Sequence, residues 1–291
     1  MNIKTISIIG LGLIGGSYGL SLKQKKSQYK IKSYARREET RKLAIEINAV
    51  DEVNSSLKES VKDADLVILT VPIEDVPDIY IEIEKFLKKG AIVTDAASTK
   101  KDIIEKIEKN KKREDIYFVG SHPMAGSDKS GLESAKADLF NDTLFIITPR
   151  DNTNLKAIDA LQEFYRVFSD KIITMPPDAH DLLVAFASHL PYFLSVSLVD
   201  VIKNMPAPQK EQIKKIVSSG FKDTTRIAMS VPVWGKDIAC TNKENILKAI
   251  ENYEDKISWW KEKIKTGSLE EIQKTLEEIK EFRRNLYNTL P

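Results

Sequence analysis

The stretch Gly10-Leu11-Gly12-Leu13-Ile14-Gly15 decides the fold, because it follows the apolar run Ile6-Ser7-Ile8-Ile9 directly and opens an amphipathic segment. A G-x-G-x-x-G that joins a strand to a helix is the fingerprint of a dinucleotide site. Its first glycine permits the tight turn, the second lets a pyrophosphate approach the backbone, and the third lets helix and strand pack closely. We therefore predict that this stretch binds a dinucleotide; the alternative is a purely structural turn.

Short β-branched runs alternate with amphipathic segments through the first half of the chain. The predicted strands are 6–9, 31–34, 66–71, 91–94, 117–119 and 144–148, with a last edge strand at 172–174, and the predicted helices lie near 14–26, 37–48, 74–88, 99–111 and 153–168. Such alternation predicts an α/β Rossmann domain, a doubly wound parallel sheet covered on both faces.

The pattern becomes helical after Met175-Pro176-Pro177, because strand signals disappear there. We predict a Rossmann domain over 1–174 and an all-α domain over 175–291. A long apolar helix should run from Asp178 to Asn204. Its residues 182–199 are the nearest approach to a membrane span, but six polar or helix-breaking residues favour a buried helix.

The last fifty residues predict a helical hairpin. Thr241-Asn242-Lys243-Glu244 has the spacing of a capping box, Thr266-Gly267 ends the first helix, and Ser268 starts the second. Each helix carries one apolar stripe. The stripe residues are Ile246, Ile250, Tyr253, Ile257, Trp260 and Ile264, then Leu269, Ile272, Leu276, Ile279 and Leu286.

The composition of the 291 residues excludes several classes of protein. Lys+Arg 45 against Asp+Glu 43 gives a net charge of +2, which does not indicate a nucleic-acid or membrane surface. The single cysteine, Cys240, allows no intrachain disulfide and fits a reducing compartment. Three scattered histidines make a metal site improbable. No export signal precedes the first strand, so we expect a cytoplasmic protein.

The end of the second predicted strand bears on the choice of cofactor. An NAD site usually carries an acid there, but this chain has Arg36 and Arg37. Arginine suits the 2′-phosphate of NADP, so we predict NADP over NAD. The alternative is a pair of solvated arginines partly neutralised by Glu38 or Glu39. The residues after the third strand, Val71 and Pro72, complete the predicted cofactor site.

Histidine at the ligand-binding edge of the sheet is the strongest candidate for catalysis. His122 follows the fifth predicted strand, in a loop of small residues, and a histidine can take up a proton near neutrality. The alternative is a structural histidine. Ser98 follows the fourth strand and could orient His122 or cap the next helix.

Two segments of the helical part are further candidates. Ser188-His189-Leu190-Pro191-Tyr192 places polar groups inside the long apolar helix, where they need partners, either a ligand or other core groups. Arg226, in the segment Gly220–Ala228, could hold a substrate carboxylate with both arms of its guanidinium, or it could be a surface arginine.

The glycine loop together with Ser121-His122-Pro123-Met124-Ala125-Gly126-Ser127, Ser188-His189-Leu190-Pro191 and the segment 220–228 resembles the prephenate and arogenate dehydrogenase family. The resemblance implies oxidative decarboxylation of a cyclohexadienyl acid and a helical domain that forms a homodimer. It also implies roles for single residues. His122 would bind the substrate ring hydroxyl with Ser98 as its partner, Arg226 would hold a carboxylate, Asp223 would support the arginine loop, Ser127, Ser188 and His189 would line the pocket, and Trp234 would lie near the subunit interface.

One position departs from the family pattern. Members selective for prephenate often carry a second histidine three residues after the first, where this chain has Tyr192. This leaves both prephenate and arogenate open as substrates. Two other functions also stay open. One is a 3-hydroxyacid dehydrogenase, a class of enzyme that usually has a catalytic lysine on a helix of the second domain; here Lys222 is the one lysine near a motif. The other is a non-catalytic dinucleotide-binding protein.

Overall fold

The computed structural model describes residues 1–25, 28–127 and 129–288. Its main sheet has six parallel strands in the order β3-β2-β1-β4-β5-β6. This is the strand order of a Rossmann fold, so the predicted doubly wound sheet is confirmed. The strands are β1 (Thr5–Ile9), β2 (Lys30–Tyr34), β3 (Glu52–Asn54), β4 (Leu66–Leu69), β5 (Ile92–Asp95) and β6 (Tyr117–Phe118).

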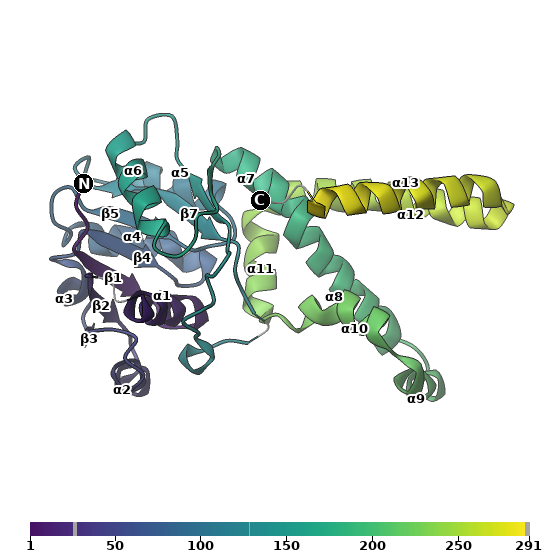
Figure 1. Ribbon diagram of the computed structural model, residues 1–291, viewed down its shortest axis with the longest axis horizontal. Coiled ribbons are helices and arrows are strands. Elements are labelled where there is room, and N and C mark those ends of the chain that lie inside the picture. The colour runs from purple at the N-terminus through teal and green to yellow at the C-terminus, as the bar shows by residue number, and fades with distance from the viewer. Residues whose placement is uncertain (26–27, 128, 289–291) are drawn as a thin grey trace. The chain divides into compact units, whose positions relative to one another are not determined.

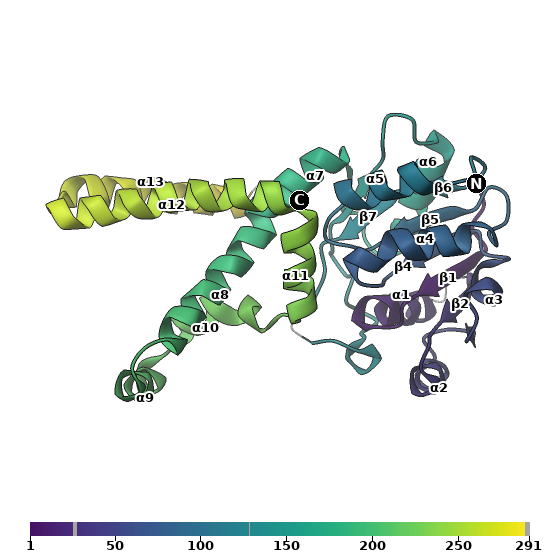
Figure 2. The ribbon, with the colours of Figure 1, turned by 180° about the vertical axis from the view of Figure 1, so that it is seen from behind.

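Helices cover both faces of this sheet: Figures 1 and 2 show α1 and α6 on one face and α4 and α5 on the other. The helices are α1 (Leu13–Gln24), α2 (Glu38–Glu46), α3 (Leu57–Val61), α4 (Val76–Glu84), α5 (Lys101–Asn110) and α6 (Leu155–Tyr165), with short 3₁₀ turns η1 (Ile73–Asp75) and η2 (Leu132–Ser134). Strand β3 and helix α3 were not predicted, because three and five residues are too few to show a period.

A second sheet of three strands lies beside the first: β7 (Gly120–Pro123), β8 (Phe145–Thr148) and β9 (Ile172–Thr174). Strand β7 is antiparallel to β8, and β8 is parallel to β9. The predicted edge strand is therefore confirmed, whereas the loop predicted around His122 is wrong, since His122 pairs with Ile146 in this sheet. A Cβ atom on Gly120 would lie 2.6 Å from the Thr148 hydroxyl, so glycine permits this close pairing.

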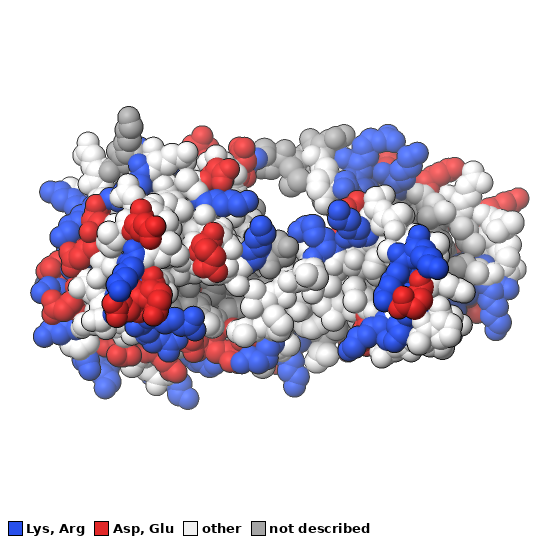
Figure 3. All heavy atoms as spheres, turned by 90° about the horizontal axis from the view of Figure 1, so that it is seen from below, with Lys and Arg blue, Asp and Glu red and all other residues white. Residues whose placement is uncertain are grey.

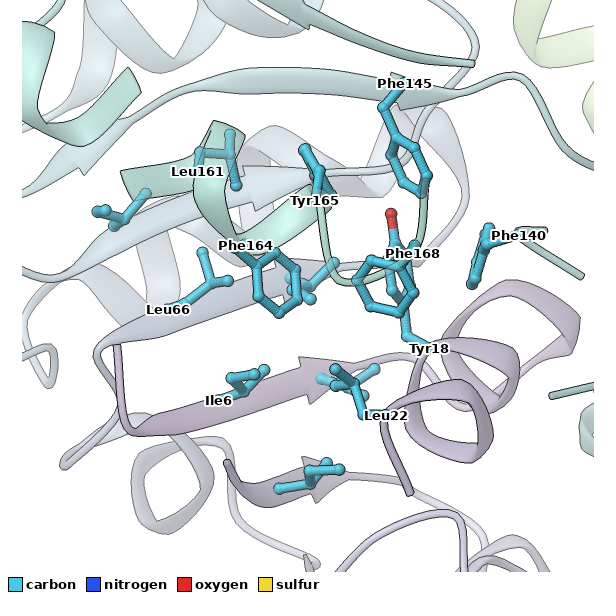
Figure 4. Packing of buried hydrophobic residues seen from close by; sticks show 14 of the residues in the cluster. Ile6, Tyr18, Leu22, Leu66, Phe140, Phe145, Leu161, Phe164, Tyr165 and Phe168 are labelled. Carbon is cyan, nitrogen blue, oxygen red and sulfur yellow. The ribbon is translucent and has the colours of Figure 1, made fainter. Parts of the chain in front are cut away.

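An aromatic cluster joins the two sheets. The rings of Tyr18 and Phe140 lie 4.4 Å apart, and those of Phe145 and Tyr165 lie 4.5 Å apart. Figure 4 shows these rings packed over the apolar side chains of β1 and β4. All four residues are fully buried, so the cluster fixes the second sheet against α1.

The helical part begins with α7 (Pro177–Val184) and α8 (Leu190–Lys203), which form one long helix with a π-helical turn at Ala185–His189. Pro191 has no N–H to donate to the preceding turn, which explains why the hydrogen-bond pattern changes there. The remaining elements are α9 (Ala207–Ile216), α10 (Ser219–Thr225), the 3₁₀ turn η4 (Arg226–Met229) and α11 (Pro232–Thr241).

The chain forms two compact units, Met1–Lys243 and Glu244–Pro291. They do not divide at the predicted boundary near residue 174, because α7 packs on α5 and α11 packs on η1. The predicted domain limits therefore stay a prediction.

The second unit consists of the rest of α12 (Lys243–Thr266) and α13 (Leu269–Asn288), as the predicted hairpin requires. Gly267 (φ +69°) makes the turn, and Lys263 pairs with Glu271 across it at 2.7 Å. The predicted capping box is wrong: Thr241 ends α11, and its hydroxyl donates to the Asp237 carbonyl. Much of the apolar stripe is exposed, for example Ile264 (70 %) and Leu269 (73 %).

Two surface properties bear on partners. The face in Figure 3 shows lysine and arginine side chains interspersed with aspartate and glutamate, in agreement with the small net charge. Among the described residues one helix, Pro177–Lys203, is long and apolar enough to span a membrane by length and composition alone. Its polar residues His180, Asp181 and His189 are nevertheless buried inside the protein.

Candidate active site

The glycine loop has the geometry of a phosphate cradle. Gly10 has φ +104°, and a Cβ on it would lie 2.6 Å from the Thr70 carbonyl oxygen. A Cβ on Gly15 would lie 2.0 Å from the Gly10 oxygen, whereas one on Gly12 would meet nothing within 4 Å. Gly12 therefore leaves open space beside the first amides of α1, which no side chain caps. These residues fit a dinucleotide pyrophosphate.

The other predicted cofactor residues contribute in different ways. Leu11 and Leu13 are buried, so they offer the backbone rather than their side chains. Val71 and Pro72 lead into η1, and the buried Asp237 of α11 accepts a hydrogen bond from the next amide, Ile73 N, at 3.2 Å. The loop after β4 is therefore tied to the helical part of the first unit.

A third arginine supports the tip of β2. Arg36 and Arg37 are exposed, and Arg41 donates from Nη1 to the carbonyls of Ala35 (2.9 Å) and Arg36 (2.7 Å). Glu38 pairs with Lys42 at 2.8 Å, and no ion pair among the described residues joins Arg36 or Arg37 to Glu38 or Glu39. Arg41 lies in the first turn of α2, seven residues after the end of β2, and was not predicted to belong to this site. The tip of β2 thus carries three guanidinium groups.

His122 lies at the start of a chain of hydrogen-bonded side chains. Its Nδ1 is 2.9 Å from Nε2 of His180, and Nδ1 of His180 is 2.7 Å from Oδ1 of Asp181. The Asp181 carboxylate also accepts from the amides of Lys100 (2.8 Å) and Lys101 (2.9 Å) at the start of α5. No hydrogen bond among the described residues involves Nε2 of His122. That nitrogen is the one available to a ligand.

A buried ion pair holds the strand that carries His122. Lys100 Nζ pairs with Asp95 and donates to the Ser121 carbonyl at 2.9 Å, and both charged side chains are fully buried. Asp95 also accepts from the Ser121 amide at 3.2 Å. The backbone on the N-terminal side of His122 is therefore fixed from two directions.

Burial lowers the pKa of all three histidines. It lowers the pKa of His122 well below its ordinary value, and the facing groups His180, Lys100 and His189 lower it further. Burial also lowers the pKa of His180, although the Asp181 carboxylate opposes the shift. For His189, burial lowers the pKa to about 4. A neutral imidazole at His122 can accept a proton at physiological pH.

Four predicted site residues form a second cluster. Trp234 Nε1 donates to Ser98 Oγ at 2.8 Å, and the Trp234 ring lies 4.9 Å from Tyr192 and 6.0 Å from His189. Ser98 does not cap α5, since the N-cap position is Lys100. Within the described chain its hydrogen-bond partner is Trp234 rather than His122.

His189 carries an unsatisfied polar atom. The side chain of Asn242 donates from Nδ2 to the Asp181 carbonyl (2.7 Å) and lies 3.2 Å from His189 Nδ1. Asn242 therefore links this cluster to the His122 chain. Nε2 of His189 is buried without a partner among the described residues, which fits an acceptor atom of a ligand.

The remaining predicted residues lie in more exposed places. Arg226 begins η4, which is held to α8 because Ala228 N donates to Ser195 Oγ at 3.1 Å. Arg226 and Asp223 are exposed, and no ion pair in the described ranges includes either one. Ser188 is half-buried in the π turn, and the exposed Ser127 accepts from the Lys129 amide at 3.2 Å. The roles predicted for these four residues stay predictions.

Comparison with known proteins identifies the family. Residues 18–174 match the family model described as prephenate dehydrogenase, nucleotide-binding domain, and residues 176–278 match prephenate dehydrogenase, dimerization domain. The chain belongs to the prephenate dehydrogenase family. This membership confirms the resemblance seen in the motifs and identifies the protein as an NAD(P)-dependent oxidoreductase. It does not support the two alternatives, a 3-hydroxyacid dehydrogenase and a non-catalytic dinucleotide-binding protein.

Members of the family are similar over nearly the whole chain. Prephenate dehydrogenase of Lactococcus lactis subsp. cremoris is 32 % identical over 97 % of this chain and 77 % of its own length. The crystal structure of the Aquifex aeolicus enzyme with hydroxyphenyl propionate and NAD⁺ is 31 % identical with a TM-score of 0.90, covering 98 % and 99 %. Synechocystis arogenate dehydrogenase is 27 % identical with a TM-score of 0.82, covering 97 % and 99 %.

Proposed function

We propose that this protein oxidatively decarboxylates a cyclohexadienyl acid, prephenate or arogenate, to 4-hydroxyphenylpyruvate or tyrosine in tyrosine biosynthesis. The observation that carries the proposal is the buried His122, whose Nε2 has no hydrogen bond within the described ranges and whose pKa burial lowers. Both substrates carry a ring hydroxyl, and an imidazole so placed can accept its proton. Relatives named for prephenate and for arogenate support the substrate class.

Apart from the substrate, the reaction needs only the oxidised dinucleotide. The proton of the ring hydroxyl passes to Nε2 of His122, and the bond to the departing carboxylate breaks toward the ring as CO₂ leaves. A dinucleotide held by the glycine loop would supply the nicotinamide that accepts the hydride from the carbinol carbon. The phenolate oxygen formed in this way takes the proton back from His122, which restores the neutral imidazole and gives the phenol. Aromatisation provides the driving force, so the protein mainly orients the groups.

Other side chains of the site bind and orient the substrate. Arg226 carries an exposed guanidinium without an ion pair in the part of the chain that the structure describes, which suits a substrate carboxylate. The Trp234 and Tyr192 rings offer an apolar wall, and buried His189 offers Nε2 as a donor. Tyr192 fits its place because Gly235 has no side chain: a Cβ there would lie 2.4 Å from the Tyr192 hydroxyl.

We further propose NADP as the preferred cofactor and a homodimer as the assembly. The guanidinium groups of Arg36, Arg37 and Arg41 at the tip of β2 support the first proposal, since they favour a 2′-phosphate. The match of residues 176–278 to a dimerization domain and the exposed apolar stripe of α12 and α13 support the second.

One experiment tests the proposed substrate and cofactor together. Prephenate and arogenate are each assayed with NAD and with NADP at equal concentrations, and kcat/KM is compared. The proposal expects turnover of at least one substrate and a higher kcat/KM with NADP. Turnover of neither substrate would overturn the function, and a much higher kcat/KM with NAD would overturn the cofactor preference.

A further inference from the structure

The hydrogen bonds behind His122 form a directed chain. Asp181 receives three donors on its two carboxylate oxygens: the amides of Lys100 and Lys101 and Nδ1 of His180. A neutral histidine carries one ring proton. If Nδ1 of His180 donates to Asp181, then Nε2 of His180 has no proton and accepts.

That direction decides the tautomer of the next histidine. Nδ1 of His122 lies 2.9 Å from Nε2 of His180, so it must donate its proton to make this bond. The proton of neutral His122 then resides on Nδ1, and Nε2 carries a lone pair. This is the tautomer that can accept the proton of a substrate hydroxyl.

We propose that His180 and Asp181 are positioning residues that hold His122 in the tautomer with Nε2 as the proton acceptor. The inference rests on the proposed function for its catalytic meaning. Neither residue needs to touch the substrate, because both act through His122. Once His122 has taken up the proton, its Nδ1–H still donates to His180, so the imidazolium keeps a hydrogen-bond acceptor.

Burial protects this chain of hydrogen bonds from water. His180 is fully buried and Asp181 is 1 % exposed, so water does not compete for these hydrogen bonds. The charged or titratable groups that face the two imidazoles are Lys100, Asp95, Asp181 and His189. Asn242 fixes the backbone of Asp181 by donating to its carbonyl at 2.7 Å. The hydrogen-bonded side chains are thus held in place by α5, α7 and the end of α11.

The tautomer can be observed directly, because the protein has three histidines. Long-range ¹H–¹⁵N correlation spectra of the histidine-labelled holoprotein, with His122→Asn used to assign the His122 signals, should show His122 protonated at Nδ1 and not at Nε2. A predominant Nε2–H form of His122 in the wild type would overturn the proposal. This readout does not depend on turnover, so it separates the proposal from a failure of the proposed function.

Variants of His180 test the kinetic consequence. His180→Leu removes the acceptor and should lower kcat about 10-fold or more with KM little changed, since both tautomers then become accessible. His180→Gln can place an amide oxygen near the position of Nε2 and should retain more of kcat than His180→Leu. A folded His180→Leu protein with kcat within twofold of the wild type would contradict the proposal.

A matched pair on α7 controls for charge. Asp178 is 70 % exposed and pairs with Lys101 at 2.8 Å, whereas Asp181 is buried behind His180. Asp181→Asn can donate to Nδ1 of His180 and so reverse the chain, which should lower kcat, whereas Asp178→Asn should leave it unchanged. Equal kcat values for the two variants, at melting temperatures that show folded protein, would refute the assigned role of Asp181.

Discussion

Replacing His122 by asparagine removes the proton acceptor but can keep the hydrogen bond to His180. The asparagine amide reaches about as far as Nδ1 of the imidazole, so it can keep the hydrogen bond to His180 that spans 2.9 Å in the wild type. It has no atom at the position of Nε2. The substitution therefore removes the proton acceptor and leaves the packing of β7 against β8 largely intact.

The size of the effect follows from the role. A positioned general base contributes about 10²–10⁴-fold to a rate. This corresponds to about 2.7–5.4 kcal/mol of activation free energy. We expect His122→Asn to lower kcat by at least about 10²-fold, while the affinity for the dinucleotide changes little, because the glycine loop lies on β1 and α1.

Steady-state rates from the absorbance of the reduced nicotinamide give kcat, and titration of the protein with the cofactor gives its affinity. A melting curve confirms that the variant is folded. If kcat stays within a few-fold of the wild type, His122 is not the proton acceptor and the mechanism is wrong.

The pH profile and two arginine variants test the remaining parts of the site. Burial lowers the pKa of His122 below its ordinary value of 6.5, so the neutral base persists as the pH falls through 6.5. We therefore expect kcat/KM to stay level around pH 6.5 and to decline only at lower pH. A decline centred at pH 6.5 or above would contradict the lowered pKa. Arg226→Ala should raise KM for the substrate much more than it lowers kcat, and an unchanged KM would remove the guanidinium from carboxylate binding. Arg37→Glu should lower kcat/KM for NADP by about tenfold or more, as expected for the loss of a phosphate contact, and change that for NAD far less; equal losses would show that Arg37 does not read the 2′-phosphate.

The sequence predicts the local features of this fold well. The glycine loop, the order of strands and helices, and the terminal hairpin all depend on short-range periodicity and turn residues. Strand β7 was not predicted, because Gly120, Ser121 and Pro123 have low strand propensity. Its pairing with β8 depends on a partner more than twenty residues away, and on a glycine that allows close approach.

Long-range partners explain what the sequence leaves out of the site. His180 is 58 residues from His122, and Trp234 is 136 residues from Ser98, so no motif spacing reveals either hydrogen bond. Buried polar residues in an apolar helix did indicate a need for partners. The sequence therefore locates the histidines but not the chain that connects them.

The central claim is that one site removes a hydride and CO₂ from the same cyclohexadienyl acid while His122 takes up the hydroxyl proton. The most direct measurement follows CO₂ released from a substrate labelled in its ring carboxylate, together with the reduced nicotinamide formed. The account predicts equal amounts of the two and an aromatic 4-hydroxyphenyl product. Reduced nicotinamide without CO₂, or neither product from prephenate and arogenate, would contradict it.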